Sequence, residues 1–77
     1  MVAAYVLIQT EVGRAGQVAR AIAEIAGVQG VEPVAGPYDV IARAEARGID
    51  ELGRLVVSRI QAVNGVTRTL TCAVTRL

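Results

Sequence analysis

The chain has 77 residues, so it forms at most one domain, residues 1–77, and a domain of this size buries only about 60% of the surface of its unfolded chain. Apolar residues make up 53% of the sequence, more than so small an interior can hide, which indicates that another copy of the chain covers part of the apolar surface. The formal net charge of +1 gives no electrostatic reason to expect nucleic-acid or membrane binding, and the lack of His excludes His-based metal sites and His-assisted nucleophiles.

The chain opens with a strand that is apolar on both faces. Residues 2–10 form a continuous apolar run with β-branched and aromatic members, as in a central strand of a sheet. Strand alternation places Tyr5 and Leu7 on one face. Val6 and Ile8 then lie on the opposite face, so we expect both faces of this strand to be covered.

A helix and a short edge strand follow. Apolar residues recur at three- and four-residue spacing from 15 to 26, which predicts an amphipathic helix that ends at Gly27. Residues 31–35 are expected to form a strand, and because Pro33 cannot donate a hydrogen bond to a neighbouring strand, we expect it at the sheet edge. A turn at residues 36–39 closes this half.

The second half again reads as strand, helix and strand. Residues 38–46 alternate in polarity, as a strand with one buried face does. Asp50 is a favourable N-cap for a second helix, which runs to about Val63. Residues 66–77 are expected to form the last strand, with Cys72 as a small buried hydrophobe. Four threonines of this segment fall on one face: Thr67, Thr69, Thr71 and Thr75.

An internal repeat favours one fold. Residues 25–31 (IAGVQGV) and 60–66 (IQAVNGV) share the pattern Ile-x-x-Val-x-Gly-Val, and we expect Gly30 and Gly65 to let the chain reverse from helix to strand. Two βαβ halves predict an α+β, ferredoxin-like βαββαβ domain: a four-stranded antiparallel sheet with two helices on one face. Because the helices cover only one face, we expect the other to stack against the sheet of a second copy.

The turn GPYD, Gly36 to Asp39, places a Tyr beside an Asp in a chain with two of each. The simplest interpretation is a hairpin turn in which Asp39 bonds backbone amides and Tyr38 packs. The alternative is a ligand loop: a carboxylate holds an ammonium group and free amides beside a glycine hold a carboxylate, which suits a zwitterionic amino acid. Thr69 and Thr71 would add hydroxyls if the fold brings them close.

The sequence contains no catalytic set. Ser58 is the single Ser and has no predicted base, and the glycines form no phosphate-binding motif. There is no helix-turn-helix and no basic stripe with aromatic residues. We therefore expect a binding or assembly module with no catalytic residues, no metal and no cofactor.

Three segments, AYVLIQT, IAGVQGVEPVAGPYDVIARAEA and ELGRLVVSRIQAVNGVTRTLTCAV, resemble the effector domain of the Lrp/AsnC regulators, also called the RAM domain (regulation of amino-acid metabolism). The resemblance covers nearly the whole chain. Its strongest pieces are V-x-G-x-Y-D-V from Val34 to Val40 and G-V-x-R-T-x-T from Gly65 to Thr71.

The resemblance implies a domain that dimerises through its sheets and assembles further into ring-like oligomers. It also implies an amino-acid effector bound between dimers, near Gly36, Tyr38 and Asp39 and near the last strand. Family members usually carry a helix-turn-helix before this domain. Because Met1 directly precedes the first strand, we expect the effector domain alone, without direct nucleic-acid binding.

We therefore expect a cytoplasmic amino-acid-sensing module that assembles with itself, can co-assemble with a full-length Lrp/AsnC regulator, and acts in the regulation of amino-acid metabolism or transcription. Two alternatives stay open: a pure assembly module without ligand, and a small cofactor-free enzyme of ferredoxin-like fold. The enzyme would need polar groups in a cleft on the sheet, where the sequence places mostly Ala, Val, Ile and Thr. The apolar run at 2–8 is too short to span a bilayer, so we expect no membrane partner.

Overall fold

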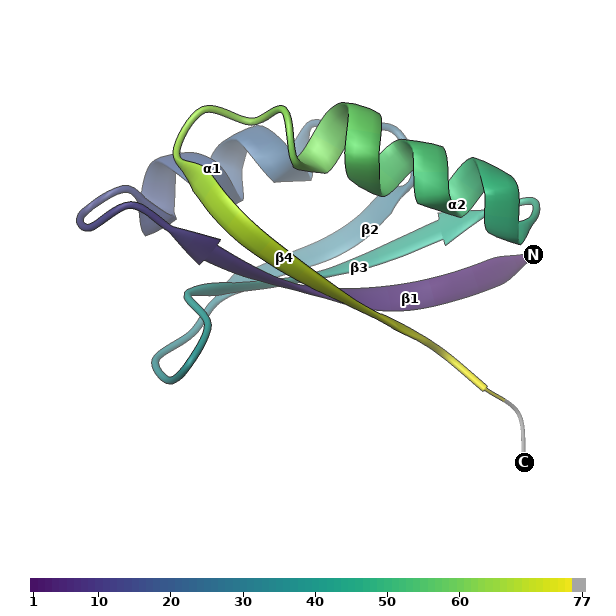
Figure 1. Ribbon diagram of the computed structural model, residues 1–77, viewed down its shortest axis with the longest axis horizontal. Helices are drawn as coiled ribbons and strands as arrows, with labels where there is room; N and C mark the ends of the chain where they lie inside the picture. Colours follow the sequence, from purple (N-terminus) through teal and green to yellow (C-terminus); the bar gives the residue numbers. More distant parts are fainter. Residues whose placement is uncertain (76–77) are drawn as a thin grey trace.

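The computed structural model describes residues 1–75, and its elements follow the predicted order (Figure 1). The strands form one antiparallel sheet in the order β2-β3-β1-β4, with both helices on the same face (Figure 1). The ferredoxin-like βαββαβ fold is therefore confirmed, and β2 lies at a sheet edge, as its proline predicted. The elements are β1 (Val2–Thr10), α1 (Ala15–Ala23), β2 (Val28–Pro33), β3 (Val40–Ala46), α2 (Ile49–Leu55), the π-helical turn η1 (Val56–Ile60) and β4 (Val66–Ala73).

The core fills the space between the helices and one face of the sheet. Alternate residues of the two inner strands point into it, and none of the following is more than 3% exposed: Ala4, Val6, Ile8, Val40, Ala42, Ala44 and Ala46. The helical side contributes Val18, Ile22, Leu52, Val56 and Ile60, none more than 5% exposed. Burial of each large aliphatic side chain favours folding by roughly 1.5–3 kcal/mol. Below α2, Leu52 packs against three buried alanines of the sheet, Ala4, Ala44 and Ala46, with Val2 partly buried beside them.

The start of the second helix differs from the prediction. Gly48 is the N-cap of α2, and its extended backbone leads into Ile49 as the first helical residue. Asp50 therefore does not cap the helix. Together with Glu51 it lies in the first turn, where a negative charge is favourable because the helix dipole is positive there. Leu52 is buried, so it sets which side of the helix packs on the sheet.

The glycine of the first repeat copy also behaves differently from the prediction. Gly30 lies within β2, and Gly27 makes the reversal instead, with a φ of +97°. In the second copy Gly65 makes it, with a φ of +103°, as predicted. A Cβ added at Gly27 would lie 2.5 Å from Leu55 Cδ1 and 3.1 Å from the carbonyl oxygen of Glu45, so no larger side chain fits there.

Element ends differ by a few residues from the predicted ones. The first helix ends at Ala23, the second helical segment ends at Ile60, and the last strand ends at Ala73. Residues 76 and 77, which were predicted to extend that strand, lie outside the described part of the chain. Within residues 1–75, no helix has the length and apolar character that a membrane crossing requires.

Candidate ligand-binding site

The GPYD turn forms the loop between β2 and β3, which projects from the sheet on the side away from the helices (Figure 1). Gly36 has a φ of +155°, and a Cβ built there would meet no described atom within 4 Å. Tyr38 and Asp39 are half-buried where the loop rejoins the sheet. The loop therefore presents an open stretch of backbone next to a tyrosine ring and a carboxylate.

Asp39 fixes this loop to the end of β1. Its Oδ2 accepts a hydrogen bond from the Thr10 backbone amide at 2.8 Å and a longer one from the Thr10 hydroxyl at 3.3 Å. The Asp39 amide donates to the carbonyl of Ile8 at 2.9 Å, and Gln9 Nε2 donates to the carbonyl of Pro37 at 2.9 Å. The carboxylate thus bonds a backbone amide, as the hairpin interpretation expects, but on the neighbouring strand. Among residues 1–75, no side-chain or backbone donor bonds Oδ1.

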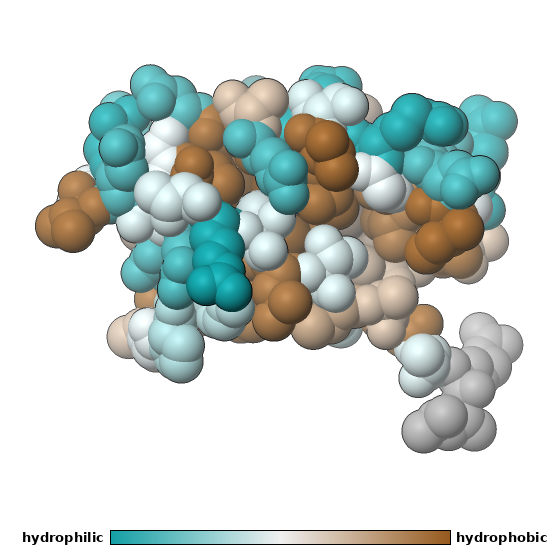
Figure 2. Space-filling model, viewed as in Figure 1, coloured by the Kyte–Doolittle hydropathy of each residue, from teal (hydrophilic) through white to brown (hydrophobic). Residues whose placement is uncertain are grey.

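Thr69 and Thr71 lie on the helix side of the sheet. They pair with Ile8 and Val6 of β1, whose side chains point into the core. Both line a groove of about 340 Å³ between β4 and the α2–η1 segment, and Figure 2 shows apolar surface between the helical layer and β4. The other lining residues are Ile49, Leu52, Gly53, Val56, Val57, Gln61 and Ala73.

The π-helical turn joins this groove to β4. The Gln61 amide donates to the carbonyl of Val56 at 2.9 Å, a bond that spans five residues. Gln61 Nε2 donates to Thr69 Oγ1 at 2.8 Å. Such turns within helices occur frequently at functional sites. The groove therefore combines apolar walls with Thr69, Thr71 and Gln61 as its polar groups.

The structure separates the predicted site residues into two groups. Gly36, Tyr38 and Asp39 lie on the β2–β3 loop, whereas Thr69 and Thr71 lie on the opposite side of the sheet in the groove. β1 separates β3 from β4, so the two groups do not meet within one chain.

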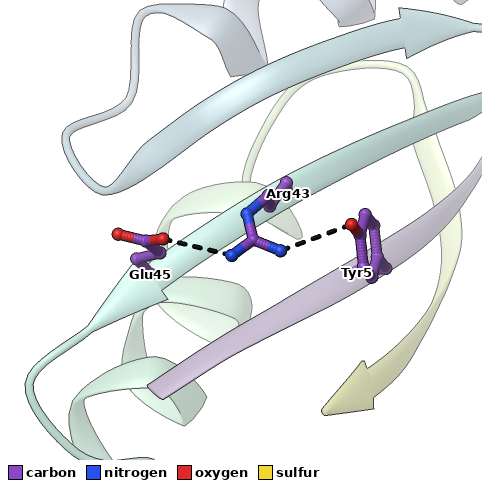
Figure 3. Close-up of polar contacts among 3 residues, drawn as sticks. All are labelled: Tyr5, Arg43 and Glu45. Carbon is purple, nitrogen blue, oxygen red and sulfur yellow. Dashed lines mark hydrogen bonds and ion pairs between the residues drawn. The ribbon is translucent and has the colours of Figure 1, made fainter. Parts of the chain in front are cut away.

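The sheet face opposite the helices, called the open sheet face below, carries a cluster of three polar side chains that the sequence did not predict (Figure 3). Arg43 Nη1 donates to the Tyr5 hydroxyl at 3.3 Å, and Arg43 Nη2 lies 3.2 Å from Glu45 Oε2. The guanidinium carbon is 5.5 Å from the centre of the Tyr5 ring, within the range of a cation–π contact. The bond to Tyr5, and next the bond to Glu45, raise the pKa of Arg43 above its ordinary value. The alternation of side chains along a strand predicts that Arg43 and Glu45 share a face. It does not predict the pairing of β1 with β3, which places Tyr5 opposite Arg43.

The rest of the open face is largely apolar. Tyr5 is 45% exposed, Leu70 49% and Val74 50%. Leu7 and Val6 lie on opposite faces, as predicted, and Leu7 faces Leu70 across the strands. Cys72 pairs with Tyr5 and is exposed on this face, so the expectation of a buried thiol was wrong for the single chain. The described residues contain no cluster of three or more His, Cys, Asp and Glu that could hold a metal ion.

Comparison with known proteins identifies the family. Residues 3–77 match the Lrp/AsnC ligand binding domain, so the chain belongs to this family. It is 38% identical over 55 residues to an uncharacterized HTH-type transcriptional regulator of Pyrococcus abyssi and 36% identical over 55 residues to one of Pyrococcus furiosus. Each match covers 71% of this chain but only 37% of the relative. A 57-residue segment is 39% identical to homocitrate synthase of Sulfurisphaera tokodaii, and it covers 74% of this chain and 12% of that enzyme.

Solved structures share the fold. The protein TTHA0845 from Thermus thermophilus is 36% identical, with a TM-score of 0.93 over 100% of this chain and 96% of its own. E. coli AsnC has the same fold, with a TM-score of 0.90 at 18% identity over 99% of this chain and 52% of AsnC. A transcriptional regulator of Neisseria meningitidis, solved as an L-Met complex, has a TM-score of 0.85 at 14% identity over 97% of this chain and 50% of its own.

Proposed function

We propose that this domain binds a free amino acid as a regulatory effector and assembles with itself to complete the site. The observation that carries the proposal is the β2–β3 loop, where an open glycine backbone lies beside a carboxylate with one oxygen unengaged by residues 1–75. The Neisseria regulator of the same fold, solved with L-Met, supports an amino acid as the ligand class.

Each group of the loop has a distinct part in this proposal. Asp39 Oδ1 attracts the ammonium group of the ligand, and the backbone amides of Ala35 and Gly36 bind its carboxylate, since Pro37 has no N–H to donate. Tyr38 forms one wall. Pro37 has a fixed φ, and its carbonyl is bonded by Gln9, so the loop loses little freedom when a ligand binds.

The threonine groove belongs to the same site if it comes from a neighbouring copy. Thr69 and Thr71 then bond the ligand, and the apolar lining of the groove receives the ligand's side chain. This arrangement makes binding depend on assembly, because the loop and the groove of one chain lie on opposite sides of the sheet.

Self-assembly in the proposal begins at the open sheet face. The half-exposed side chains of Tyr5, Leu70 and Val74 form an apolar surface that a second sheet would cover. A full-length Lrp/AsnC regulator presents a domain of the same family, so we extend the proposal to co-assembly with such a regulator.

Calorimetry of the assembled protein against the twenty amino acids tests the proposal. We expect saturable binding of one amino acid or of a chemically related few. Native mass spectrometry in the same buffer gives the oligomeric state. If the oligomer is intact and none of the twenty binds, the pure assembly module is the better description, and the Asp39–Thr10 bond is then the whole role of that carboxylate.

A further inference from the structure

We propose that Arg43 and Glu45 select the partner of the open sheet face, so that this face accepts a second copy of this chain and rejects a related domain with other charges at these positions. This inference rests on the sheet-stacked assembly proposed above. It adds the residues that decide which chains pair.

Arg43 and Glu45 both lie on an inner strand of the sheet. β3 and β1 are the inner strands, and Arg43 lies directly opposite Tyr5 as Glu45 lies opposite Ala3. The charges therefore lie within the face, next to apolar side chains. Two further charged residues of this face, Glu32 and Arg68, lie on the outer strands β2 and β4, where water would still reach them after stacking.

Within residues 1–75, both charged groups keep unused hydrogen-bonding capacity. A guanidinium has five N–H donors, and among the described residues Arg43 uses two of them, toward Tyr5 and Glu45. Among residues 1–75, the Glu45 carboxylate accepts a hydrogen bond through Oε2 alone. Desolvating these groups in an interface is costly unless the partner completes their bonds.

Two-fold symmetry supplies that completion. In an isologous interface the same patch comes from both sides, so a face that carries one cation beside one anion can meet its own copy with opposite charges in contact. A hollow of about 550 Å³ beside the pair, lined in part by Ala3, Arg43, Glu45 and Val74, gives space for the partner's side chains. Opposed like charges penalise a wrong partner, which is how charged residues usually confer specificity.

Charge reversal gives a direct experiment. Arg43→Glu places two carboxylates on the face, and Glu45→Arg places two guanidinium groups there. We expect each variant alone to self-associate about tenfold or more weakly than wild type, and an equimolar mixture of the two to recover mixed dimers. The double variant Arg43→Glu/Glu45→Arg should pair with itself and not with wild type, because its charges are exchanged. Native mass spectrometry distinguishes these species by mass.

The controls separate this inference from the sheet stacking on which it depends. Thermal melting of each variant reports whether the chain still folds. If a single variant is unstable alone, the recovery of mixed dimers on mixing still tests the inference. Leu70→Asp disrupts the apolar part of the face without changing either charged residue. If Leu70→Asp abolishes the dimer while all three charge variants self-associate and mix like wild type, stacking stands and the charge selection is wrong. If wild type is monomeric, or if Leu70→Asp dimerises normally, the sheet stacking itself is wrong.

Discussion

Asp39 has to serve two purposes with one carboxylate. Oδ2 holds the end of β1 through the Thr10 amide, and Oδ1 is proposed to receive the ammonium group of a ligand. The two roles respond differently to substitution because an amide oxygen can keep the bond to Thr10, whereas only a carboxylate carries the charge. The hairpin and ligand-loop interpretations of GPYD are therefore compatible. Two variants of Asp39 measure the structural role and the binding role separately.

Asp39→Asn is expected to weaken ligand binding by about tenfold or more, equivalent to about 1.4 kcal/mol per decade, while the unfolding free energy falls by less than about 1 kcal/mol. Asp39→Ala loses both roles, and its unfolding free energy should fall by about 1–3 kcal/mol. Calorimetric affinity and thermal melting of both variants give the answer. An Asn variant that melts earlier yet binds like wild type would leave Asp39 with the structural role alone.

Gly27 and Gly30 give a second matched pair at this scale. Gly27→Ala puts a Cβ against Leu55 and the Glu45 carbonyl at a φ that side chains disfavour, so we expect a loss of about 1–3 kcal/mol of unfolding free energy. Gly30 has no described atom near its Cβ position, and Gly30→Ala should change stability by about 0.5 kcal/mol or less. Urea denaturation measures both. Equal losses of unfolding free energy in the two variants would mean that the chain reverses at Gly30 after all.

At the scale of elements, apolar periodicity was sufficient to predict the order of strands and helices, because a period of two or of three to four persists over each whole segment. The sheet edge followed from Pro33, which lacks a donor. The placement of β4 could not be inferred in the same way. Its register against β1 puts Thr69 and Thr71 on the helix side and the more apolar Leu70 and Cys72 on the open face, and register depends on contacts between distant residues.

That placement of β4 yields a prediction for assembly. Leu70→Asp puts a charge into the apolar open face, so we expect the dimer to weaken about tenfold or more while the monomer stays folded, because Leu70 is 49% exposed in the single chain. Val12→Asp is the matched control, since Val12 is fully exposed in the turn between β1 and α1, away from both the open face and the groove. Analytical ultracentrifugation compares the two. A stronger effect of the Val12 variant would place the dimer contact away from the open sheet face.

For the whole molecule, the candidate site was the least predictable feature. The sequence suggested both its parts, the GPYD loop and the threonine row, but how they lie relative to each other depends on the three-dimensional order of the strands. With β1 between β3 and β4, a single chain separates the loop from the groove. The proposed site is thus a property of the assembly, which leads to a test based on mixing chains.

Asp39→Asn removes the charge of the loop, and Thr71→Val removes a hydroxyl of the groove with little change in shape. Each variant alone should bind the effector weakly, because every site then carries one lesion. If loop and groove come from different chains, oligomers assembled from an equimolar mixture contain about one quarter of sites with both wild-type parts, and these should bind with wild-type affinity.

The mixture is made by co-expression and its stoichiometry is measured by calorimetry, with native mass spectrometry confirming mixed oligomers. A site built within one chain predicts no recovery, because every chain in the mixture carries a lesion, and that result would contradict the shared site.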